Sequence, residues 1–506
     1  MNLQQAASAI REASAGGAVS LARVPGVYPA SVKSFNDALF CLVRTGQGKR
    51  LAVAGPPGAA ADFEGTVVEG VKICELDAGN AAALREAFPW TAPVTIGRRA
   101  SFGTGDRLGV CTPGHLRAFS RFEIFPVLAQ QSMRELGRTG RTPRQVIDDA
   151  GWGAFEAGYA GTFAADADHI KQADEAVSCY RLGFTMFTID ASDHIDLKAV
   201  HLEDDEALER FEQLGGHREV LDRYLGKSWS FSKGGLKFTI EFSAPELARC
   251  ALVYHRAVEH MALVYRELSA AAGNSVEGFD FEVSVDETET DTTVRDHLFV
   301  AGELKARGVA WQSLAPKFTG QFQKGIDYIG DLDEFERQFA AHALLAEKLG
   351  PYKVSVHSGS DKFSIFPLVG KHTGGFFHLK TAGTSWLEAV RVIAAHRPEL
   401  YREMHRFALE NFGKDRASYH VTTDLDSIPE VGTLADSDLP ALMDKVDSRQ
   451  LLHITYGSLL SVRDESGEYL FRDRIFRVLY EREEDLYSNL DRHIGRHLET
   501  LGTAAK

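Results

Sequence analysis

Two stretches of this chain place reactive side chains directly after an apolar strand pattern, and they constrain the fold more than any other feature. Residues 279–289 read Phe-Asp-Phe-Glu-Val-Ser-Val-Asp-Glu-Thr-Glu, and residues 352–362 read Tyr-Lys-Val-Ser-Val-His-Ser-Gly-Ser-Asp-Lys. A helix, a third strand and a second helix are predicted between them. Reactive groups at the carboxyl ends of parallel strands are typical of an α/β barrel. We therefore predict that the chain is organised around such a barrel.

Strand-like and helix-like segments alternate from about residue 100 onward, and residues 117–136 read as a helix. This alternation implies a parallel sheet, and eight strand–helix units fit a (β/α)₈ TIM-like barrel. The eight predicted strands are Leu108–Thr112, Gly161–Asp166, Phe184–Ile189, Phe279–Val285, Val309–Leu314, Tyr352–His357, Phe376–Lys380 and Ser418–Thr422.

The rest of the chain reads as additions to the barrel. Residues 1–100 form a small N-terminal α/β domain without a catalytic cluster, interpreted as a packing or dimerising unit, so a homodimer is one expectation. The barrel spans residues 101–430, with a mostly helical insertion at about 191–275 that contains a hairpin around Gly234 and Gly235. Residues 431–506 form a C-terminal helical segment that packs on the barrel.

Composition excludes several classes of protein. The formal net charge of −15 argues against nucleic acid or a membrane surface as a partner. The five cysteines are scattered and form no CxxC pair, as expected of reduced thiols. No apolar run approaches the about 18 residues of a membrane helix, and the first 17 residues lack the pattern of a signal peptide. We expect a cytoplasmic protein.

A glycine-rich stretch at residues 103–109, Gly-Thr-Gly-Asp-Arg-Leu-Gly, comes close to a dinucleotide fingerprint but misses it. The last glycine falls one residue late, and the glycines precede the apolar run instead of following a strand. No nicotinamide cofactor is therefore expected. The two first glycines are better explained as a tight loop, with Asp106 and Arg107 structural or at the mouth of a site.

Polar residues repeatedly occupy one face of the predicted strands. Because successive strand residues face opposite sides, the residues of each of these five sets share a face: Glu282, Ser284 and Asp286; Ser355 and His357; His378 and Lys380; Ser418, His420 and Thr422; Asp166 and Asp168. A barrel interior is usually packed with Val, Ile and Leu. A single buried histidine is more often a core residue than a ligand, but several strands with the same polarity predict a polar pocket.

Histidine together with Asp or Glu is a mixed nitrogen and oxygen donor set, which suits Zn²⁺, Mn²⁺, Ni²⁺ or Co²⁺ better than Ca²⁺. From face and strand-end position we predict a divalent metal ion held by Asp168, Glu282, His357 and His378, with His169 and His420 in reserve. The ion would act as a Lewis acid. Two simpler interpretations stay open: residues 286–289 as a solvated loop, and Asp190 and Asp168 as caps of following helices.

Nine segments between residues 102 and 385 occur in an order that resembles the tagaturonate epimerases, metal-dependent hexuronate 4-epimerases. The segments are Phe102–Gly109, Thr112–His115, Gly137–Pro143, Ala165–His169, Gly183–Asp190, Glu282–Glu289, Leu314–Lys317, His357–Lys362 and Lys380–Ser385. The resemblance covers roughly residues 100–425 and implies interconversion of tagaturonate and fructuronate, a keto-hexuronate substrate and a metal requirement.

These two sugar acids differ at C4, whose proton is α to neither carbonyl. Retro-aldol cleavage of C3–C4 is the favoured route, and transient oxidation by nicotinamide is disfavoured because no dinucleotide loop is present. Acid and base roles are predicted for Asp286 and Glu287, with Asp361 second. The residues predicted to bind the substrate are Lys380, Lys317, Lys362 and Arg107 at its carboxylate and Asp106 at a hydroxyl group.

Two other functions remain open from the sequence. A metal-dependent sugar isomerase or aldolase would use the same barrel and metal, and its product would distinguish it. A sugar-acid sensor without turnover is disfavoured, because a binding protein does not need so many titratable groups at one site.

Overall fold

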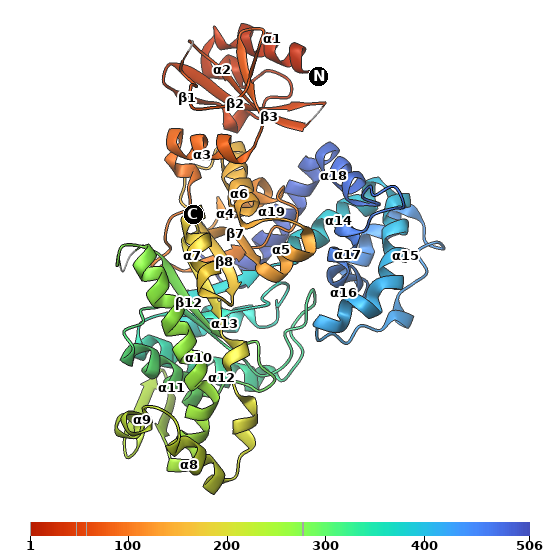
Figure 1. Ribbon diagram of the computed structural model, residues 1–506. Coiled ribbons are helices and arrows are strands. Elements are labelled where there is room, and N and C mark those ends of the chain that lie inside the picture. Colours follow the sequence, from red (N-terminus) through yellow and green to blue (C-terminus); the bar gives the residue numbers. More distant parts are fainter. Residues whose placement is uncertain (1, 47, 57, 276–277) are drawn as a thin grey trace.

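A closed barrel of eight parallel strands occupies the middle of the molecule in this computed structural model (Figure 1). The structure describes residues 2–46, 48–56, 58–275 and 278–506, and of Ser418 it describes the backbone alone. An N-terminal sheet lies at one end of the molecule, a helical insertion at the other, and a group of C-terminal helices beside the barrel. The predicted (β/α)₈ fold is confirmed.

The barrel strands follow one another around the barrel in chain order, and the eighth pairs with the first. The strands are β6 (Ser101–Thr104), β7 (Phe125–Ser132), β8 (Ala164–Ile170), β9 (Met186–Asp190), β12 (Asp280–Val285), β13 (Ser313–Pro316), β14 (Lys353–Val356) and β15 (Phe377–Thr381). The helices around them are α4 (Thr112–Phe119), α5 (Met133–Thr139), α6 (Pro143–Ala157), α7 (Ala173–Leu182), α10 (Ala244–Ala271), α11 (Val294–Ala306), α12 (Leu332–Leu349), α13 (Phe366–Thr373) and α14 (Thr384–His396).

Two of the eight predicted strands are wrong, and both errors have a local cause. Residues 108–111 form a loop and Thr112 begins α4, because the Asp106 carboxylate accepts the backbone N–H groups of Leu108, Gly109 and Cys111. Residues 418–422 end a 3₁₀ turn and continue irregularly, and the N–H of Thr422 donates to the side chain of Gln323 instead of to a strand. Strand β7 instead lies in the segment that was predicted to be helical.

The inside of the barrel is polar. Along β12, Glu282 and Ser284 face inward, whereas Phe281 and Val283 join the apolar layer between strands and helices. The strands β8, β9, β14 and β15 alternate in the same way, so charged side chains accumulate in the interior. The amino end of the barrel is closed by a small apolar cluster of Ile96, Phe125, Val127, Ala164 and Met186. Chemistry is therefore confined to the carboxyl ends of the strands.

The N-terminal sheet is antiparallel, with the strand order β1-β2-β3-β5-β4. Its elements are α1 (Leu3–Ser14), α2 (Gly17–Leu21), η1 (Pro29–Ser31), β1 (Lys33–Phe35), β2 (Ala38–Thr45), β3 (Gly48–Ala54), β4 (Thr66–Val68), β5 (Val71–Cys74), α3 (Ala78–Ala87) and η2 (Pro89–Thr91). One face packs on α1. The other packs through Phe40 on Phe88, which in turn contacts Phe155 of the barrel helix α6.

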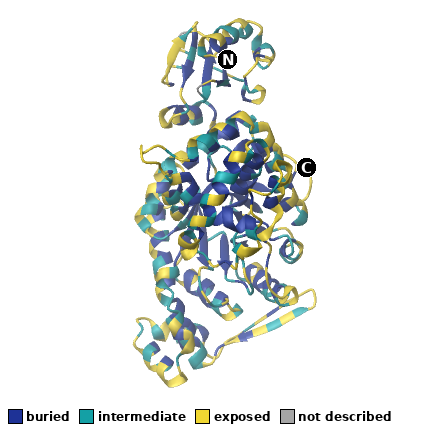
Figure 2. Cartoon of the chain, turned by 90° about the vertical axis from the view of Figure 1, so that its right-hand side faces the viewer, coloured by how far each residue is buried: buried dark blue, intermediate teal, exposed yellow. Residues whose placement is uncertain are grey.

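The insertion after β9 carries η3 (Ser192–His194), η4 (Leu197–His201), α8 (Asp204–Glu212), α9 (His217–Tyr224) and a hairpin of β10 (Ser228–Lys233) with β11 (Leu236–Glu241). The hairpin strands are largely exposed (Figure 2). The long helix α10 returns the chain to the barrel, where it packs between α7 and α11. The insertion thus leaves the barrel order undisturbed.

The C-terminal helices share a second apolar core with α14. They comprise α15 (Pro398–Asp415), η5 (Arg416–Ser418), η6 (Leu425–Ser427), η7 (Asp436–Asp444), α16 (Val446–Ile454), α17 (Tyr456–Ser461), α18 (Arg472–Glu481) and α19 (Glu483–Thr500). Helix α19 packs against α4, and α17 packs against α5. Among the helices of the described ranges, none combines the length and apolarity that crossing a membrane requires.

Candidate active site

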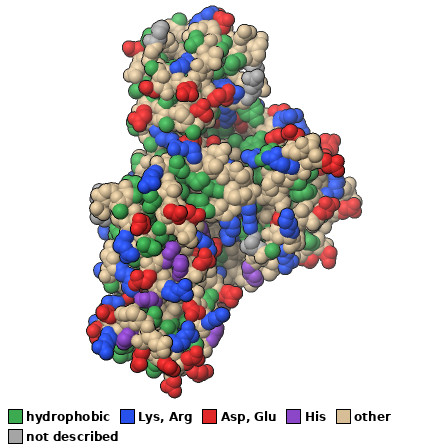
Figure 3. Space-filling model, viewed as in Figure 1, with side chains coloured by type: hydrophobic (Ala, Val, Ile, Leu, Met, Phe, Trp, Pro, Cys, Tyr) green, Lys and Arg blue, Asp and Glu red, His purple; other side chains and the backbone are tan. Residues whose placement is uncertain are grey.

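A cavity of about 510 Å³ opens at the carboxyl ends of the barrel strands. The loops after β12, β13 and β14, together with the ends of β7, β8 and β15, supply most of its walls. Tyr419, His420 and His453 complete it from the segment that follows α15. The cavity therefore lies between the barrel and the C-terminal helices. Acidic and basic side chains are interspersed over the face of the molecule shown in Figure 3.

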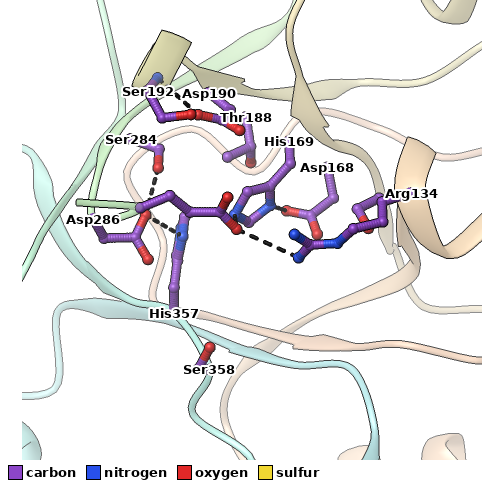
Figure 4. A network of polar contacts seen from close by, with 12 residues as sticks. Arg134, Asp168, His169, Thr188, Asp190, Ser192, Ser284, Asp286, His357 and Ser358 are labelled. Carbon is purple, nitrogen blue, oxygen red and sulfur yellow. Dashed lines mark hydrogen bonds and ion pairs between the residues drawn. The ribbon is translucent and has the colours of Figure 1, made fainter. Parts of the chain in front are cut away.

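Three side chains at one side of this cavity form a cluster with the spacing of a metal site. His169, Asp286 and His357 each offer one ligand atom, and these atoms lie within 4.8 Å of one another. They come from the ends of β8, β12 and β14, which are not adjacent in sequence (Figure 4). His357 Nδ1 lies 3.0 Å from Asp286 Oδ1.

Each histidine of the cluster is held by a carboxylate at its other nitrogen. His169 Nδ1 lies 2.9 Å from Asp168 Oδ1, and His357 Nε2 lies 2.7 Å from Glu282 Oε1. An ionised carboxylate only accepts, so these nitrogens carry protons. The opposite nitrogens, His169 Nε2 and His357 Nδ1, lie 3.5 Å from Glu287 Oε1 and 3.0 Å from Asp286 Oδ1, and a metal ion would bind them in place of a proton. Carboxylates orient metal-binding histidines in the same way in many metal sites.

Lys380 lies beneath the cluster and is bound by three carboxylates. Its Nζ is 2.7 Å from Asp166 Oδ2, 2.8 Å from Asp168 Oδ1 and 2.9 Å from Glu282 Oε1, and it also donates to Thr188. Burial raises the pKa of Asp166, the Lys380 ammonium opposes this rise, and the result is a pKa of about 6. The ammonium therefore neutralises the floor of the site.

The cluster attracts positive charge. Burial disfavours protonation of His357, but the carboxylates of Asp286 and Glu282 outweigh burial and raise its pKa to about 10. Burial likewise disfavours protonation of His169, and Asp168 outweighs it and raises the pKa above the usual value. Two imidazoles and a carboxylate surrounded by further carboxylates fit a divalent ion such as Zn²⁺, Mn²⁺, Ni²⁺ or Co²⁺.

The backbone is strained at two turns beside the cluster. His169 and Ser358 have φ angles of 53° and 50°, and Asp361 in the same loop as Ser358 has 63°. Residues other than glycine rarely adopt this left-handed conformation, and strain of this kind concentrates at functional sites. At His169 and beside His357, the unusual turn sets the direction in which the imidazole leaves the strand end.

Cationic side chains occupy another part of the cavity wall. Arg107, Arg134, Lys317 and Lys324 all line it. Arg107 is 2 % exposed and binds Glu135 through Nε and Nη2, at 2.9 and 2.7 Å. Arg134 lies 3.4 Å from Glu287 Oε1 and is solvent-exposed. The cavity is thus acidic at the cluster and basic beyond it.

The structure brings together three of the four predicted metal ligands, but in different roles. His357 belongs to the cluster, while Asp168 and Glu282 bind the histidines and Lys380. His378 does not join them, because it lies deeper in the barrel with its Nδ1 2.8 Å from Ser101 Oγ. His169, predicted as a reserve ligand, is in the cluster, and the other reserve, His420, lines the cavity without belonging to it.

Among the predicted acid, base and substrate residues, Asp286, Glu287, Lys317, Lys380 and Arg107 line the cavity. Asp361, Lys362 and Asp106 do not. Asp361 binds Arg449 and His493 behind the cavity. Lys362 donates to the carbonyl groups of Gln323, Ile326 and Ser360, and burial lowers its pKa to about 7. The Asp106 carboxylate is occupied by backbone N–H groups of its own loop.

Several residues of the cavity wall are not predicted from the sequence, among them Gln130, Arg134, Lys324 and His453. Arg134 and Lys324 lie in segments with no strand-end pattern, and His453 comes from α16, outside the barrel. Gln130 lies in β7, which was predicted as helix. The alternation of polar residues along a strand can reveal only Gln130 among these four, and only if β7 is recognised as a strand.

Comparison with known proteins agrees with the geometry. A family model described as tagaturonate epimerase matches residues 28–501. A tagaturonate/fructuronate epimerase of Thermotoga maritima is 47 % identical over 480 residues, which cover 94 % of this chain and 96 % of that protein.

Solved structures of a fructuronate-tagaturonate epimerase from Cohnella laeviribosi have the same fold. The native crystal structure is 43 % identical with a TM-score of 0.90, and the match covers 97 % of this chain and all of that one. A glycerol complex is 44 % identical, again with a TM-score of 0.90, and the match covers 94 % of this chain and 96 % of the other.

Proposed function

This chain belongs to the tagaturonate epimerase family and is an isomerase-class enzyme, and from that premise we propose that it interconverts tagaturonate and fructuronate by metal-assisted retro-aldol chemistry at C4. The observation that carries the metal part of the proposal is the cluster of His169, Asp286 and His357 at the cavity wall. The imidazole nitrogens that face Asp286 and Glu287, and the excess of carboxylates around them, support binding of a divalent ion.

In this proposal, His169, Asp286 and His357 hold the ion, and Asp168 and Glu282 keep the two imidazoles in the required tautomers. A bound divalent ion supplies Lewis-acid stabilisation of negative charge on the substrate oxygens. Lys380 balances the charge of the carboxylates below and keeps them in place. Its ammonium is fully engaged there, which argues for other residues at the substrate carboxylate.

The reaction itself needs a base that removes the proton of the C4 hydroxyl group. Breaking C3–C4 then leaves an aldehyde at C4, and the electron pair stays on C3 in conjugation with the C2 carbonyl. Rotation of the aldehyde and attack by C3 on its other face inverts C4, and the base returns the proton. Glu287 is the carboxylate best placed for this transfer, since it lines the cavity and its Oε1 lies 3.5 Å from His169 Nε2.

The test uses metal-stripped protein incubated with fructuronate in D₂O, with and without Mn²⁺, Zn²⁺, Ni²⁺ or Co²⁺, while proton NMR follows tagaturonate. We expect the C4 epimer to form only with metal and to carry no deuterium at C4, because the C4–H bond is never broken. Deuterium at C4 would rule out the retro-aldol route. Failure of every metal to support conversion by folded protein would rule out the epimerase.

A further inference from the structure

The part of the cavity beyond the metal cluster contains a buried cationic group that is held rigidly yet has an unused donor. The guanidinium of Arg107 binds Glu135 through Nε and Nη2, and its Nη2 lies 3.4 Å from His453 Nε2. Its plane covers the ring of Tyr456, with 3.6 Å between the guanidinium carbon and the ring centroid. The remaining nitrogen, Nη1, is buried and has no hydrogen-bond partner among the described residues.

His453 fixes this arrangement. A guanidinium can only donate hydrogen bonds, so the Nε2 of His453 must accept from Arg107, and the imidazole is neutral. The pKa of His453 is well below its usual value, mainly because the ring is buried and in addition because it faces the positive charge of Arg107. Gly383 leaves the space for this ring, since a Cβ at that position would lie 1.7 Å from His453 Cε1. Arg107 is therefore preorganised before any ligand arrives.

Lys324 adds a second positive charge without a carboxylate of its own. Its Nζ donates to Ser358 Oγ at 2.8 Å, and no Asp or Glu oxygen in the described ranges lies within ion-pair distance of it. Burial lowers the pKa of Lys324, and the nearby Arg134 and Arg107 lower it further. Three cations, Arg107, Arg134 and Lys324, thus face two carboxylates, Glu135 and Glu287, and the surplus positive charge favours an anionic ligand.

We infer that Lys324 and the free Nη1 of Arg107 bind the C6 carboxylate of the substrate, an inference that rests on the proposed function. A buried donor that lacks a partner is expected to find one in a ligand. Asp286, which lines the cavity at the metal cluster, repels a carboxylate. The sugar acid is thereby oriented with its C6 carboxylate at Lys324 and Arg107 and its keto end toward the metal cluster.

The inference is tested with Lys324→Met, Lys324→Arg and Lys317→Met, assayed with tagaturonate and with its uncharged C6 amide. Lys317 is the matched competitor, because it lines the same cavity. We expect Lys324→Met to raise the KM for tagaturonate about ten- to a hundredfold with a smaller change in kcat, and to leave the KM for the amide unchanged. Lys324→Arg should restore most of the affinity, and Lys317→Met should change the KM less than threefold.

Two results would overturn the inference. One is an equal rise in the KM for the acid and for the amide in Lys324→Met, which would mean that the lysine only supports the fold. The other is a larger rise in the KM for tagaturonate in Lys317→Met than in Lys324→Met. Calorimetric titration of the same variants with tagaturonate separates this inference from the proposed function. Wild-type protein that binds the acid more tightly than the amide without converting it supports the carboxylate site and refutes the epimerase.

Discussion

Two clusters of histidine and carboxylate flank the loop that follows β14, and they differ in what completes them. His169, Asp286 and His357 face the cavity, and each histidine directs one nitrogen at Asp168 or Glu282 and the other at a carboxylate of the cavity wall, Glu287 or Asp286. Asp361, His493 and His497 lie behind the same loop, with ligand atoms equally close to one another. Residue types and distances alone therefore do not distinguish the clusters.

The second cluster is already saturated. Asp361 binds Arg449 and His493, each at 2.6 Å. The Nε2 of His497 accepts the backbone N–H of Asp361, and its Nδ1 lies 2.8 Å from the carbonyl oxygen of His493. Arg449 gives Asp361 a permanently charged partner, whereas Asp286 of the first cluster is paired with the imidazole of His357. We conclude that the second cluster is a structural latch, which holds the loop of residues 357–362 against α16 and α19.

The largest expected effect comes from opening the first cluster. Asp286→Asn or His357→Ala should lower kcat/KM by roughly 10²–10⁴-fold, because each substitution removes both a proposed ligand and the charge that attracts the ion. Metal content by plasma mass spectrometry should fall with the activity. The control is His372→Ala, which removes a histidine of α13 that binds Glu336 of α12. This variant should retain both its activity and its metal content. Full metal content in both cluster variants would contradict the assignment.

Breaking the latch should change stability and leave metal content intact. Arg449→Met leaves the buried carboxylate of Asp361 without its main partner, and losses of about 3–5 kcal/mol are typical of such changes. Urea unfolding measures the difference. The control is Arg337→Met, whose ion pair with Glu334 is exposed and should contribute less than about 1 kcal/mol. Loss of metal from Arg449→Met at unchanged stability would reverse the roles of the two clusters.

The smallest effect is the response of the latch to acid. Burial and then the neighbouring His493 lower the pKa of His497 to about 3. The unfolded chain, with a histidine pKa of about 6.5, binds the proton more readily, so stability falls as pH falls from about 6.5 toward 3, by at most ~1.4 kcal/mol per pH unit. His493 opposes this, because Asp361 outweighs burial and raises its pKa.

Urea unfolding of wild type and His497→Gln at pH 6.5, 5.5 and 4.5 checks this expectation. The glutamine oxygen can still accept the N–H of Asp361 but does not titrate, so the variant should show a shallower loss of stability in acid. Parallel pH profiles for the two proteins would exclude His497 as the source.

The strands whose side chains alternate between polar and apolar could be predicted from the sequence. The inward faces of β12, β14 and β15 were visible in the sequence, because side chains in a strand alternate regardless of its neighbours. This pattern placed Glu282, Asp286, His357 and Lys380 in one interior. It could not identify which of these side chains bind the metal ion, because the position of each along the barrel axis depends on the register between strands. His378, for example, pairs with Ser101 one layer below the cluster.

The rest depends on contacts between distant segments. Strand β7 was misread because it carries Ala and Gln residues, which a polar barrel accepts and which read as helical in isolation. Lys324 and His453 reach the cavity from a loop after β13 and from α16. No local pattern marks such residues, since their position follows from how the C-terminal helices pack.

The latch also determines when the site can form. Asp361 and His493 are separated by 132 positions in the chain, and their contact closes a loop that contains α14 and every C-terminal helix. Contacts between such distant positions form late, because the chain loses conformational entropy on closing the loop before the contact itself stabilises the fold. The barrel can acquire its strands while residues 357–362 are still unrestrained, so secondary structure is expected to precede catalytic competence during folding.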